Sequence, residues 1–299
     1  MPGAEDLAWS PASRTVYVSS QDRRPKVPTP RGALFAWDAE RPLSEPRAIQ
    51  VPIENFHPHG ISVWRMNGYD RLFVVNHPVD APARIEVLDV KGDRAQLVRS
   101  VTAPAPFSPN DLIAVGPDEF YVGSDHGVEG LPRQLWDDLT GRRRGYILHH
   151  DGHDFARVVD GIVYPNGLLY DARTRRLYVA STMGQAVHVY HRAAPRQLSY
   201  LGGFRVPGLA DNLEWDAAGE RILVGAHPST ARFLAHAASA SSRAPSRVVS
   251  LDPVSGHVES RFEDDGRAIS AVSVGVETPY GELFVGGVFD PRVLRCRTR

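Results

Sequence analysis

A short hydrophobic phrase recurs six times along the chain, and this repeat limits the possible folds more than any other feature of the sequence. Each copy places two or three apolar or aromatic residues around a valine, usually followed by a small residue. The copies occupy residues 16–19, 72–75, 120–123, 177–180, 222–225 and 283–286. Short runs of β-branched and aromatic residues favour strands, and six units of roughly 50 residues are typical of a β-propeller. The sequence therefore predicts an all-β, six-bladed propeller.

Turn-forming residues and flanking strand patterns complete each unit. Pro, Asp, Asn and Gly precede five of the phrases, at residues 10–13, 66–68, 116–118, 171–173 and 216–219, and they favour tight hairpin turns. Outer strands are expected at 33–38, 84–89, 187–191 and 247–252. Leu135, Trp136 and Leu139 share one helical face, which predicts a short helix around 133–140. An Ala- and Ser-rich stretch at 235–245 is expected to be a loop, and residues 1–299 are expected to form one domain.

Composition excludes several classes of function. The formal net charge is −1, and the one dense basic run, Arg142 to Arg144, is expected to be solvated surface rather than a nucleic-acid site. With Cys296 as the single cysteine, neither an internal disulfide nor a Cys-based metal site can form. No run reaches the roughly 18 apolar residues of a membrane helix, and no hydrophobic leader precedes the first strand. This indicates a cytoplasmic protein, or a secreted one if the N-terminus is truncated; the sequence specifies no oligomeric state.

Polar side chains stand just before the innermost strand of every unit. They are Glu5 and Asp6, His59, Asn110 and Asp111, Asn166, Asp211 and Asn212, and Ser270. Their distances to the valine of the same unit are similar, between 12 and 15 residues, so they occupy equivalent places on the blades. Because the innermost strands of a propeller line its central channel, these residues are expected to converge around the axis at one mouth.

Buried carboxylates and amides at such a mouth need a partner, and a hard cation satisfies them most simply. Glu5 and Asp211 supply two negative charges that balance one Ca²⁺, and Asn110, Asn166 and Asn212 add neutral oxygens. Five protein ligands leave one to three positions for water or substrate if Ca²⁺ takes about 6–8 oxygens. Mg²⁺ ranks second because it demands stricter octahedral geometry. The alternative for any one doublet is ordinary turn capping, which becomes less attractive when five blades repeat the pattern.

The doublets suggest a second, deeper cation. Asp6 follows Glu5 and Asp111 follows Asn110. Adjacent strand residues point in opposite directions, so one member of each pair can face the mouth while the other faces along the channel. Asp6 and Asp111 are therefore candidate ligands of a second ion.

Several phrases resemble the serum paraoxonase/arylesterase family, in the same order from Gly3 to Cys296. The most specific are His-Pro-His-Gly-Ile-Ser at 57–62 and Asn-Asp-Leu-Ile-Ala-Val-Gly-Pro at 110–117; others are 3–7, 74–78, 166–167, 211–212 and 225–228. More distantly, the chain is similar to gluconolactonase and senescence-marker-protein propellers. The resemblance implies a six-bladed propeller with two axial calcium ions that hydrolyses lactones, aryl esters and some organophosphate triesters.

The resemblance also assigns residues. The catalytic calcium would be held by Glu5, Asn110, Asn166, Asp211 and Asn212. The structural calcium would be held by Asp6, Asp111 and the backbone oxygen of Ile61. His59 and His77 would activate water.

The chain departs from the family pattern in three places. Cys296 lacks its N-terminal partner, a strand that would close the last blade from the N-terminal side is missing, and the loop 21–31 lacks a tyrosine found there in some members. Substrate preference therefore does not transfer from the family.

The expected chemistry is transfer of an acyl group to water, with calcium polarising the carbonyl and His59, oriented by His77, as general base; Glu5 is the next candidate base. Phe56, Tyr164, Val288 and Phe289 are expected to form an apolar wall, with the 135–139 helix as a lid. The histidines could instead be structural.

The remaining histidines have other expected roles, and two other functions are compatible with the sequence. His126 and His227 are expected to be structural or to line the pocket, and His149, His150 and His153 with Asp154 to form an exposed turn rather than a metal cluster. No Gly-x-Ser-x-Gly elbow is present. The alternatives are a sugar-lactone hydrolase and a non-enzymatic, calcium-stabilised binding module.

Overall fold

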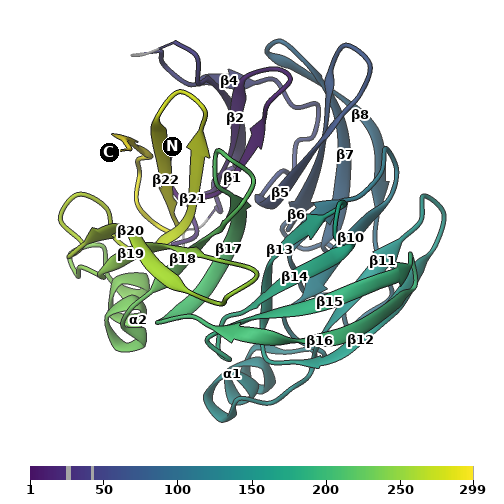
Figure 1. Ribbon diagram of the computed structural model, residues 1–299. Coiled ribbons are helices and arrows are strands. Elements are labelled where there is room, and N and C mark those ends of the chain that lie inside the picture. The colour runs from purple at the N-terminus through teal and green to yellow at the C-terminus, as the bar shows by residue number, and fades with distance from the viewer. Residues whose placement is uncertain (25–27, 42–43, 299) are drawn as a thin grey trace.

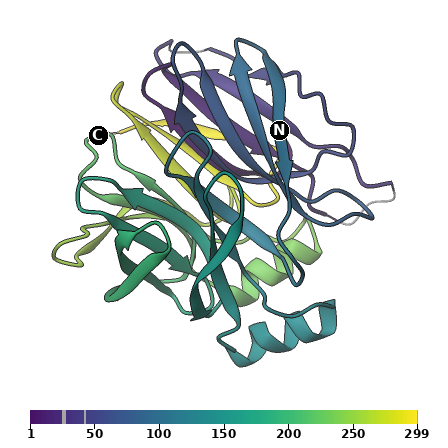
Figure 2. The same cartoon turned by 90° about the vertical axis from the view of Figure 1, so that its right-hand side faces the viewer.

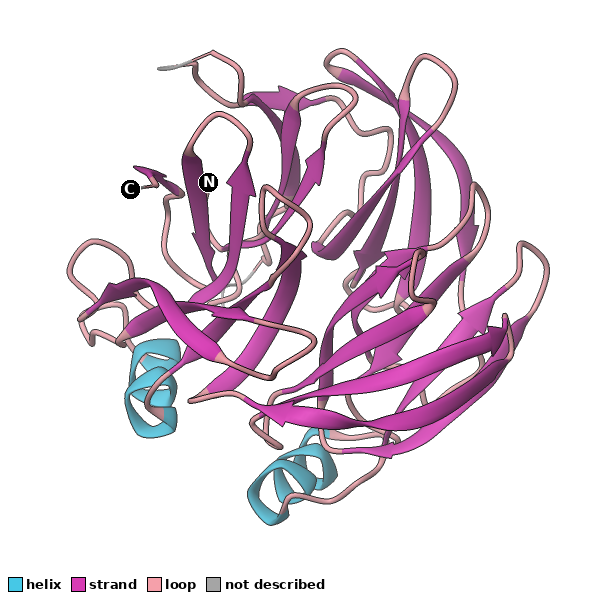
Figure 3. Cartoon of the chain, in the orientation of Figure 1, coloured by secondary structure: helices cyan, strands magenta, loops and turns pink. Residues whose placement is uncertain are grey.

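The computed structural model describes residues 1–24, 28–41 and 44–298, and in these residues the chain forms six antiparallel β-sheets (Figures 1 and 3). The first strands of the successive sheets are β1, β5, β9, β13, β17 and β21. These strands contact one another in that order, and β21 contacts β1, so the ring closes. The predicted all-β, six-bladed propeller is confirmed.

Five blades have four strands each in the described part of the chain. Blade 1 contains β1 (Ala4–Ser10), β2 (Thr15–Ser20), β3 (Ala33–Asp38) and β4 (Arg47–Ile49). Blade 2 contains β5 (Pro58–Arg65), β6 (Asp70–Asn76), β7 (Arg84–Lys91) and β8 (Arg94–Val101). Blade 3 contains β9 (Pro109–Ala114), β10 (Phe120–Ser124), β11 (Gly145–His150) and β12 (Phe155–Ile162). Blade 4 contains β13 (Pro165–Asp171), β14 (Arg176–Ser181), β15 (Ala186–Ala194) and β16 (Gln197–Arg205).

The last two blades end the ring. Blade 5 contains β17 (Leu209–Trp215), β18 (Ile222–His227), β19 (Ser246–Leu251) and β20 (Val258–Asp264). Blade 6 contains β21 (Val272–Thr278), β22 (Glu282–Gly287) and β23 (Leu294–Arg297), which is the whole of this sheet among the described residues. The six repeated phrases form the second strand of each blade, and the four predicted outer strands are present within three residues of their expected bounds.

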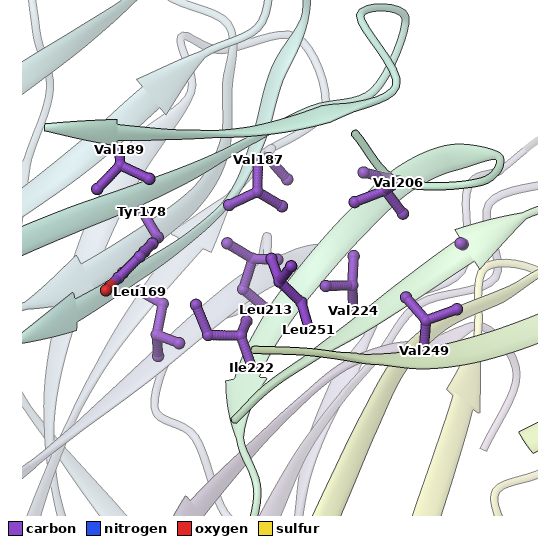
Figure 4. Packing of buried hydrophobic residues seen from close by; sticks show 13 residues of the cluster. Leu169, Tyr178, Val187, Val189, Val206, Leu213, Ile222, Val224, Val249 and Leu251 are labelled. Atoms are coloured by element: carbon purple, nitrogen blue, oxygen red, sulfur yellow. The ribbon is translucent and has the colours of Figure 1, made fainter. Parts of the chain in front are cut away.

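The hydrophobic core is divided among the six junctions between neighbouring blades. At the junction of blades 4 and 5, Tyr178 and Val187 pack against Leu213, Ile222 and Val249 (Figure 4). Equivalent clusters join every other pair of neighbours, including blades 6 and 1. Each blade therefore buries both faces, which explains why the second strands are apolar on successive residues rather than alternating.

Two short helices project from the same end of the ring (Figures 1 and 2). α1 (Leu131–Thr140) connects β10 to β11, as predicted, and Gly141 ends it in the left-handed conformation. α2 (Thr230–Ala238) connects β18 to β19. The prediction of a loop at 235–245 is therefore wrong over 235–238. Alanine has the highest helix propensity, and Ser229 caps α2 by accepting a hydrogen bond from the Arg232 backbone nitrogen.

The innermost strands are irregular where the polar residues stand. In blades 1 to 5 the pairing with the second strand shifts register at or beside the predicted position. A bulge places two consecutive residues opposite one partner residue, so both can turn toward the same side. This explains how consecutive residues reach two cavities: Glu5 and Asn110 line one, while Asp6 and Asp111 line the next one along the axis.

Glycine follows the polar residue in blades 2 and 4, where neighbouring strands approach closely. A Cβ added to Gly60 would lie 2.5 Å from Oδ1 of Asp111, and one added to Gly167 would lie 2.5 Å from the Asp211 backbone oxygen. Only glycine permits the neighbouring strand to come this close, because it has no Cβ. The paired polar residues of blades 3 and 5 occupy the space that a side chain at Gly60 or Gly167 would need.

Candidate active site at the channel mouth

Five oxygen-bearing side chains from four innermost strands meet near the axis, at the end that carries the helices. Glu5, Asn110, Asn166, Asp211 and Asn212 are each at most 5% exposed. All except Asn212 line one cavity of about 450 Å³, and Asn212 joins the group by donating from Nδ2 to Glu5 Oε1 at 2.9 Å. The structure thus brings together the residues that the offsets within the repeat predicted.

The three amides use their nitrogen atoms on the protein and leave their oxygens free. Asn166 Nδ2 donates to Asp211 Oδ1 at 2.7 Å and to Thr182 Oγ1 at 3.1 Å, and Asn110 Nδ2 lies 3.5 Å from Asp125 Oδ2. The carboxylate acceptors fix which end of each amide is nitrogen. The Oδ1 atoms of all three asparagines are buried without a hydrogen-bond partner. Buried polar atoms are almost always satisfied, so these oxygens indicate a cation.

The two acidic members are held differently. Asp211 Oδ2 pairs with His227 Nε2 at 2.8 Å, and its other oxygen accepts from Asn166. Glu5 Oε2 accepts no hydrogen bond, although it lies 3.6 Å from Arg23 Nη2 and 3.5 Å from His59 Nε2. Burial raises the pKa of Glu5 to about 7, against the opposing effect of Arg23. A bound cation would relieve this cost by keeping the carboxylate ionised.

The donor set fits calcium because of its chemistry. Among the described residues, no three His, Cys, Asp or Glu side chains gather as a metal-binding cluster, so the fit rests on amide oxygens combined with two carboxylates. Oxygen donors without sulfur suit a hard ion such as Ca²⁺ rather than a transition metal.

The cavity above the ring has an apolar wall to which both helices contribute. Leu135 and Leu139 of α1 and Phe233 and Leu234 of α2 line it. The expected wall residues Tyr164, Val288 and Phe289 also line it. Phe56 does not: it is fully buried in the cluster between blades 1 and 2, so that expectation is wrong. A large aromatic side chain in a loop before a strand packs into the nearest core, and the sequence does not show its direction.

The two predicted histidines are in contact. His59 Nδ1 lies 3.2 Å from His77 Nε2. His77 also bonds the backbone of Pro109, which leaves its other ring nitrogen as the donor because a carbonyl only accepts. Burial lowers the pKa of His59 well below its ordinary value and that of His77 to about 4, so both rings are neutral at pH 7.

The set predicted for the second ion lies further along the channel. Asp6, Ile61 and Asp111 line a cavity of about 150 Å³. The Ile61 backbone nitrogen donates to Asp6 Oδ2 at 2.7 Å, and the Leu168 nitrogen donates to Asp111 Oδ2 at the same distance. Asp111 Oδ1 is buried without a partner. Burial, and next for Asp6 the charge of Asp111, raises both carboxyl pKa values well above the ordinary value.

A third acidic residue, Glu214, lines the same cavity and was not among the sequence-predicted ligands. Its neighbours Leu213 and Trp215 pack in the core between blades 4 and 5, so the alternation of a strand turns Glu214 toward the channel. Burial raises its pKa to about 8. The sequence could have indicated Glu214, because it stands two residues after Asn212 on the same strand and residues at this spacing point to the same side.

Other polar positions are used to hold the fold. Ser270 hydrogen-bonds Ala244 and Gly266, and its backbone nitrogen donates to Asp290, so it does not complete the ring from blade 6. His149 and His150 are buried in β11, not in an exposed turn; only the turn 151–154 and His153 match that expectation. His149 pairs with Glu119 at 2.7 Å.

His126 and His227 flank the site. His126 bridges Asp125 at 2.8 Å and Asp138 of α1 at 3.0 Å, which ties the helix to blade 3 and raises the pKa of His126 to about 10. His227 lines the cavity and contacts Asp211. Arg23, which the sequence did not indicate as a site residue, reaches Glu5 from the loop after β2. Residues 25–27 of that loop lie outside the described residues.

A family model described as Arylesterase matches residues 29–297. The chain belongs to the arylesterase family. It is 25% identical to human serum paraoxonase/lactonase 3 over 308 aligned positions, which cover 98% of this chain and 85% of that protein. Human serum paraoxonase/arylesterase 1 matches with 25% identity and the same coverage. The resemblance found in the sequence is therefore confirmed, and the family supports a hydrolase activity for this arylesterase-family chain.

Solved structures share the fold of this arylesterase-family chain. A gluconolactonase from Xanthomonas campestris superposes with a TM-score of 0.64 at 19% identity, over 100% of this chain and 86% of that one. A calcium-binding protein, regucalcin from Agrobacterium tumefaciens, superposes with a TM-score of 0.60 at 13% identity, over 95% and 82% of the two chains. Within the described residues, no helix is long and apolar enough to cross a membrane.

Proposed function

We propose that this protein is a calcium-dependent hydrolase of lactones and aryl esters whose reaction takes place at the channel mouth. The observation that carries the proposal is the set of free buried oxygens, from Asn110, Asn166, Asn212 and Glu5, at the floor of an apolar-walled cavity. Family membership supports the reaction class, and relatives named as lactonases and arylesterases support the substrate class.

Calcium held by Glu5, Asn110, Asn166, Asp211 and Asn212 would polarise the substrate carbonyl and stabilise negative charge on its oxygen. The amide groups are preorganised for this because their nitrogens are already bound to Glu5, Asp211, Thr182 and Asp125.

The histidine pair has the protonation pattern of a general base. His77 donates one ring N–H to the Pro109 carbonyl, so its Nε2 is an acceptor. His59 Nδ1–H then donates to His77 Nε2, which leaves His59 Nε2 with a lone pair beside the cavity. His59 can therefore accept a proton from a water molecule, and His77 is a positioning residue. Glu5 Oε2, 3.5 Å from His59 Nε2, can accept a hydrogen bond from the protonated ring.

The reaction balances with water alone. The water oxygen bonds to the carbonyl carbon, and its proton passes to His59 Nε2. The ring C–O bond of the lactone then breaks, and the alkoxide takes the proton back as it becomes a hydroxyl group. The product is a hydroxy acid, or an alcohol and an acid from an open ester.

A panel of substrates tests the proposal: aliphatic lactones, a sugar lactone, phenyl acetate and a phosphotriester, each assayed with calcium and with chelator. We expect turnover of lactones and phenyl acetate with calcium, loss of turnover on chelation, and recovery when calcium returns. The apolar wall predicts that aliphatic lactones exceed the sugar lactone.

If no substrate is hydrolysed while calcium still raises the melting temperature, the protein is a calcium-stabilised binding module instead. A preference for the sugar lactone would favour the gluconolactonase-like alternative.

A further inference from the structure

Tyr164 lines the candidate active-site cavity in an unusual backbone conformation. It shares the cavity of about 450 Å³ with His59 and Asp211. Its φ is +52°, a left-handed value that is rare for a large side chain and that occurs preferentially at functional sites. The Thr182 backbone nitrogen donates to the Tyr164 backbone oxygen at 3.0 Å and holds this conformation. The backbone therefore fixes the direction in which the Tyr164 ring points.

The hydroxyl group of Tyr164 is unused by the protein. In the part of the chain that the structure describes, it forms no hydrogen bond, yet it is not one of the fully enclosed polar atoms that lack a partner. It therefore faces open space, and the space that Tyr164 lines is the cavity. Structural tyrosines of this protein differ, because the hydroxyls of Tyr17 and Tyr121 bond Asp70 and the Pro195 backbone oxygen.

Nearby charges show which part of the cavity the hydroxyl faces. Burial raises the pKa of Tyr164 well above its ordinary value, and the negative charges of Asp125, Asp138, Asp211 and Glu5 raise it further. The last three of these residues line the cavity together with Tyr164. The hydroxyl thus lies near the predicted calcium ligands rather than on the outer surface.

The carboxylates around Tyr164 already bond other donors. Asp125 and Asp138 hold His126 at 2.8 and 3.0 Å, and the Tyr164 ring packs edge-on against His126 with 5.2 Å between the ring centroids. Asp211 has a partner on each of its oxygens. A tyrosine hydroxyl, with an ordinary pKa of about 10, carries its proton at pH 7. Its hydrogen is therefore available to a molecule bound in the cavity.

Tyr164 and His59 approach the cavity from different blades. His59 is on β5 of blade 2, and Tyr164 directly precedes β13 of blade 4. When water adds to an ester, the attacking oxygen and the leaving oxygen are different substituents of one carbon, so the base and a donor to the leaving oxygen must stand apart. The carbonyl oxygen is assigned to the cation. The oxygen of the leaving group is therefore the one that still lacks a partner.

We propose that the Tyr164 hydroxyl donates a hydrogen bond to the leaving-group oxygen of the substrate, which makes Tyr164 a further catalytic residue. The proposal rests on the hydrolase function proposed above. The bond from the acyl carbon to the leaving oxygen breaks, and its electron pair moves onto that oxygen. The Tyr164 O–H bond stays intact, and the proton that the leaving oxygen takes up still comes from His59 Nε2.

A series of acetates isolates this role, because the acyl group stays the same while the leaving group changes. The series is 4-nitrophenyl, phenyl, trifluoroethyl and ethyl acetate, in order of increasing basicity of the leaving oxygen. Values of kcat/KM with calcium are compared for the native protein, Tyr164→Phe and Tyr280→Phe. Tyr280 is exposed in the turn 279–281 and lines neither the cavity nor the channel, so Tyr280→Phe is the matched loss of a hydroxyl.

We expect the loss in Tyr164→Phe to grow along the series, from about 2-fold for 4-nitrophenyl acetate to about 100-fold for ethyl acetate. A more basic leaving oxygen carries more negative charge as the bond breaks, so it gains more from a hydrogen-bond donor. Tyr280→Phe should match the native protein throughout. Isothermal titration calorimetry should give the same calcium dissociation constant for all three proteins, which shows that the loss does not come from the metal site.

If melting temperatures show that Tyr164→Phe is not folded, 3-fluorotyrosine placed at position 164 replaces it. Its more acidic hydroxyl is a stronger donor of nearly the same shape, so ethyl acetate should gain relative to 4-nitrophenyl acetate. A loss that is equal for all leaving groups, or no loss at all, overturns the role of Tyr164 while the hydrolase function stands. If the native protein hydrolyses no member of the series and no lactone, both proposals fail.

Discussion

The two levels of the central channel differ in how they use most of their buried oxygens, although Asp111 Oδ1 at the lower level is also without a partner. At the upper level, next to the helices, the amide oxygens of Asn110, Asn166 and Asn212 are free, and the cavity above them is open to a ligand. At the lower level, Asp6 and Asp111 accept backbone N–H groups of Ile61 and Leu168, which belong to the following blades. The upper level is arranged for binding, and the lower level ties blade 1 to blade 2 and blade 3 to blade 4.

This difference arises within pairs of adjacent residues. Glu5 and Asp6 belong to the two levels, as do Asn110 and Asp111, because a bulge turns both members toward the axis. Function and closure of the ring are therefore encoded side by side in the same strands. Substitutions at the two levels should separate activity from stability.

The largest expected effect is on turnover at the upper level. Asp211→Ala removes a carboxylate and leaves Asn166 Nδ2 and His227 Nε2 without their acceptor. We expect kcat/KM for a lactone to fall about 1000-fold or more, measured by steady-state kinetics at saturating calcium. Glu129→Ala, at an exposed acidic residue just before α1, is the matched control and should keep full turnover. Retained turnover in Asp211→Ala would show that the upper level is not the reaction site.

The histidine pair should give the next largest effect. His59→Gln removes the proton acceptor and should lower kcat about 100-fold, in the range of general-base catalysis. His77→Gln should lower it less, about 10-fold, because His77 only orients the neighbouring ring. Single-turnover kinetics at several pH values separate the two roles. His153→Gln, at an exposed turn, controls for loss of an imidazole; equal losses in His59→Gln and His77→Gln would contradict the assignment of the base.

The sequence predicts which residues lie near the channel axis, but it does not predict where their side chains point. Equal offsets within the repeat locate Asn110, Asn166 and Asp211, because equivalent strand positions converge by symmetry. Side-chain direction does not follow from an offset: Ser270 turns into its own loop, and Phe56 turns into the core.

Tertiary contacts also decide which atoms stay free. The sequence gives the resemblance that pairs His59 with His77, but the tautomer comes from the contact of His77 with Pro109. The sequence also predicts Tyr164 in the cavity wall, but it does not show that the hydroxyl stays free. This depends on Asp125 and Asp138, which bond His126 instead.

At the lower level the expected effect is on stability. Asp111→Asn keeps the size of the side chain but replaces a carboxylate that accepts the Leu168 N–H at 2.7 Å. We expect the free energy of unfolding to fall by about 2 kcal/mol, the usual cost of weakening a buried charged hydrogen bond, measured by urea denaturation with calcium present. Asp265→Asn, in an exposed turn, should change nothing measurable. A stable Asp111→Asn variant would remove the distinction between the two levels.

The smallest expected effect is the pH dependence of the calcium-free protein. Burial raises the pKa of Glu5 to about 7 and that of Glu214 to about 8, above the values of these groups in the unfolded chain. The folded state then holds protons that the unfolded state has released, so stability falls as pH rises through these values. The buried histidines with lowered pKa oppose this trend only below about 6.5, where unfolded histidine titrates. Melting temperature in chelator should therefore fall between about pH 6.5 and 8.

Calcium should flatten that decline, because an ion compensates the ionised carboxylates. The pKa of His126 is raised to about 10, so this residue also makes stability fall as pH rises, with or without calcium. It therefore accounts for the pH dependence of the melting temperature that remains when calcium is bound. Glu214→Gln should reduce the slope in chelator and leave the calcium-loaded slope closer to that of the native protein, because one of the four channel carboxyls with a raised pKa no longer titrates. The pH dependence of the melting temperature could instead be equal with and without calcium, in the native protein and in Glu214→Gln. The channel carboxyls would then not ionise within this pH range, and a bound cation would not be compensating their negative charge.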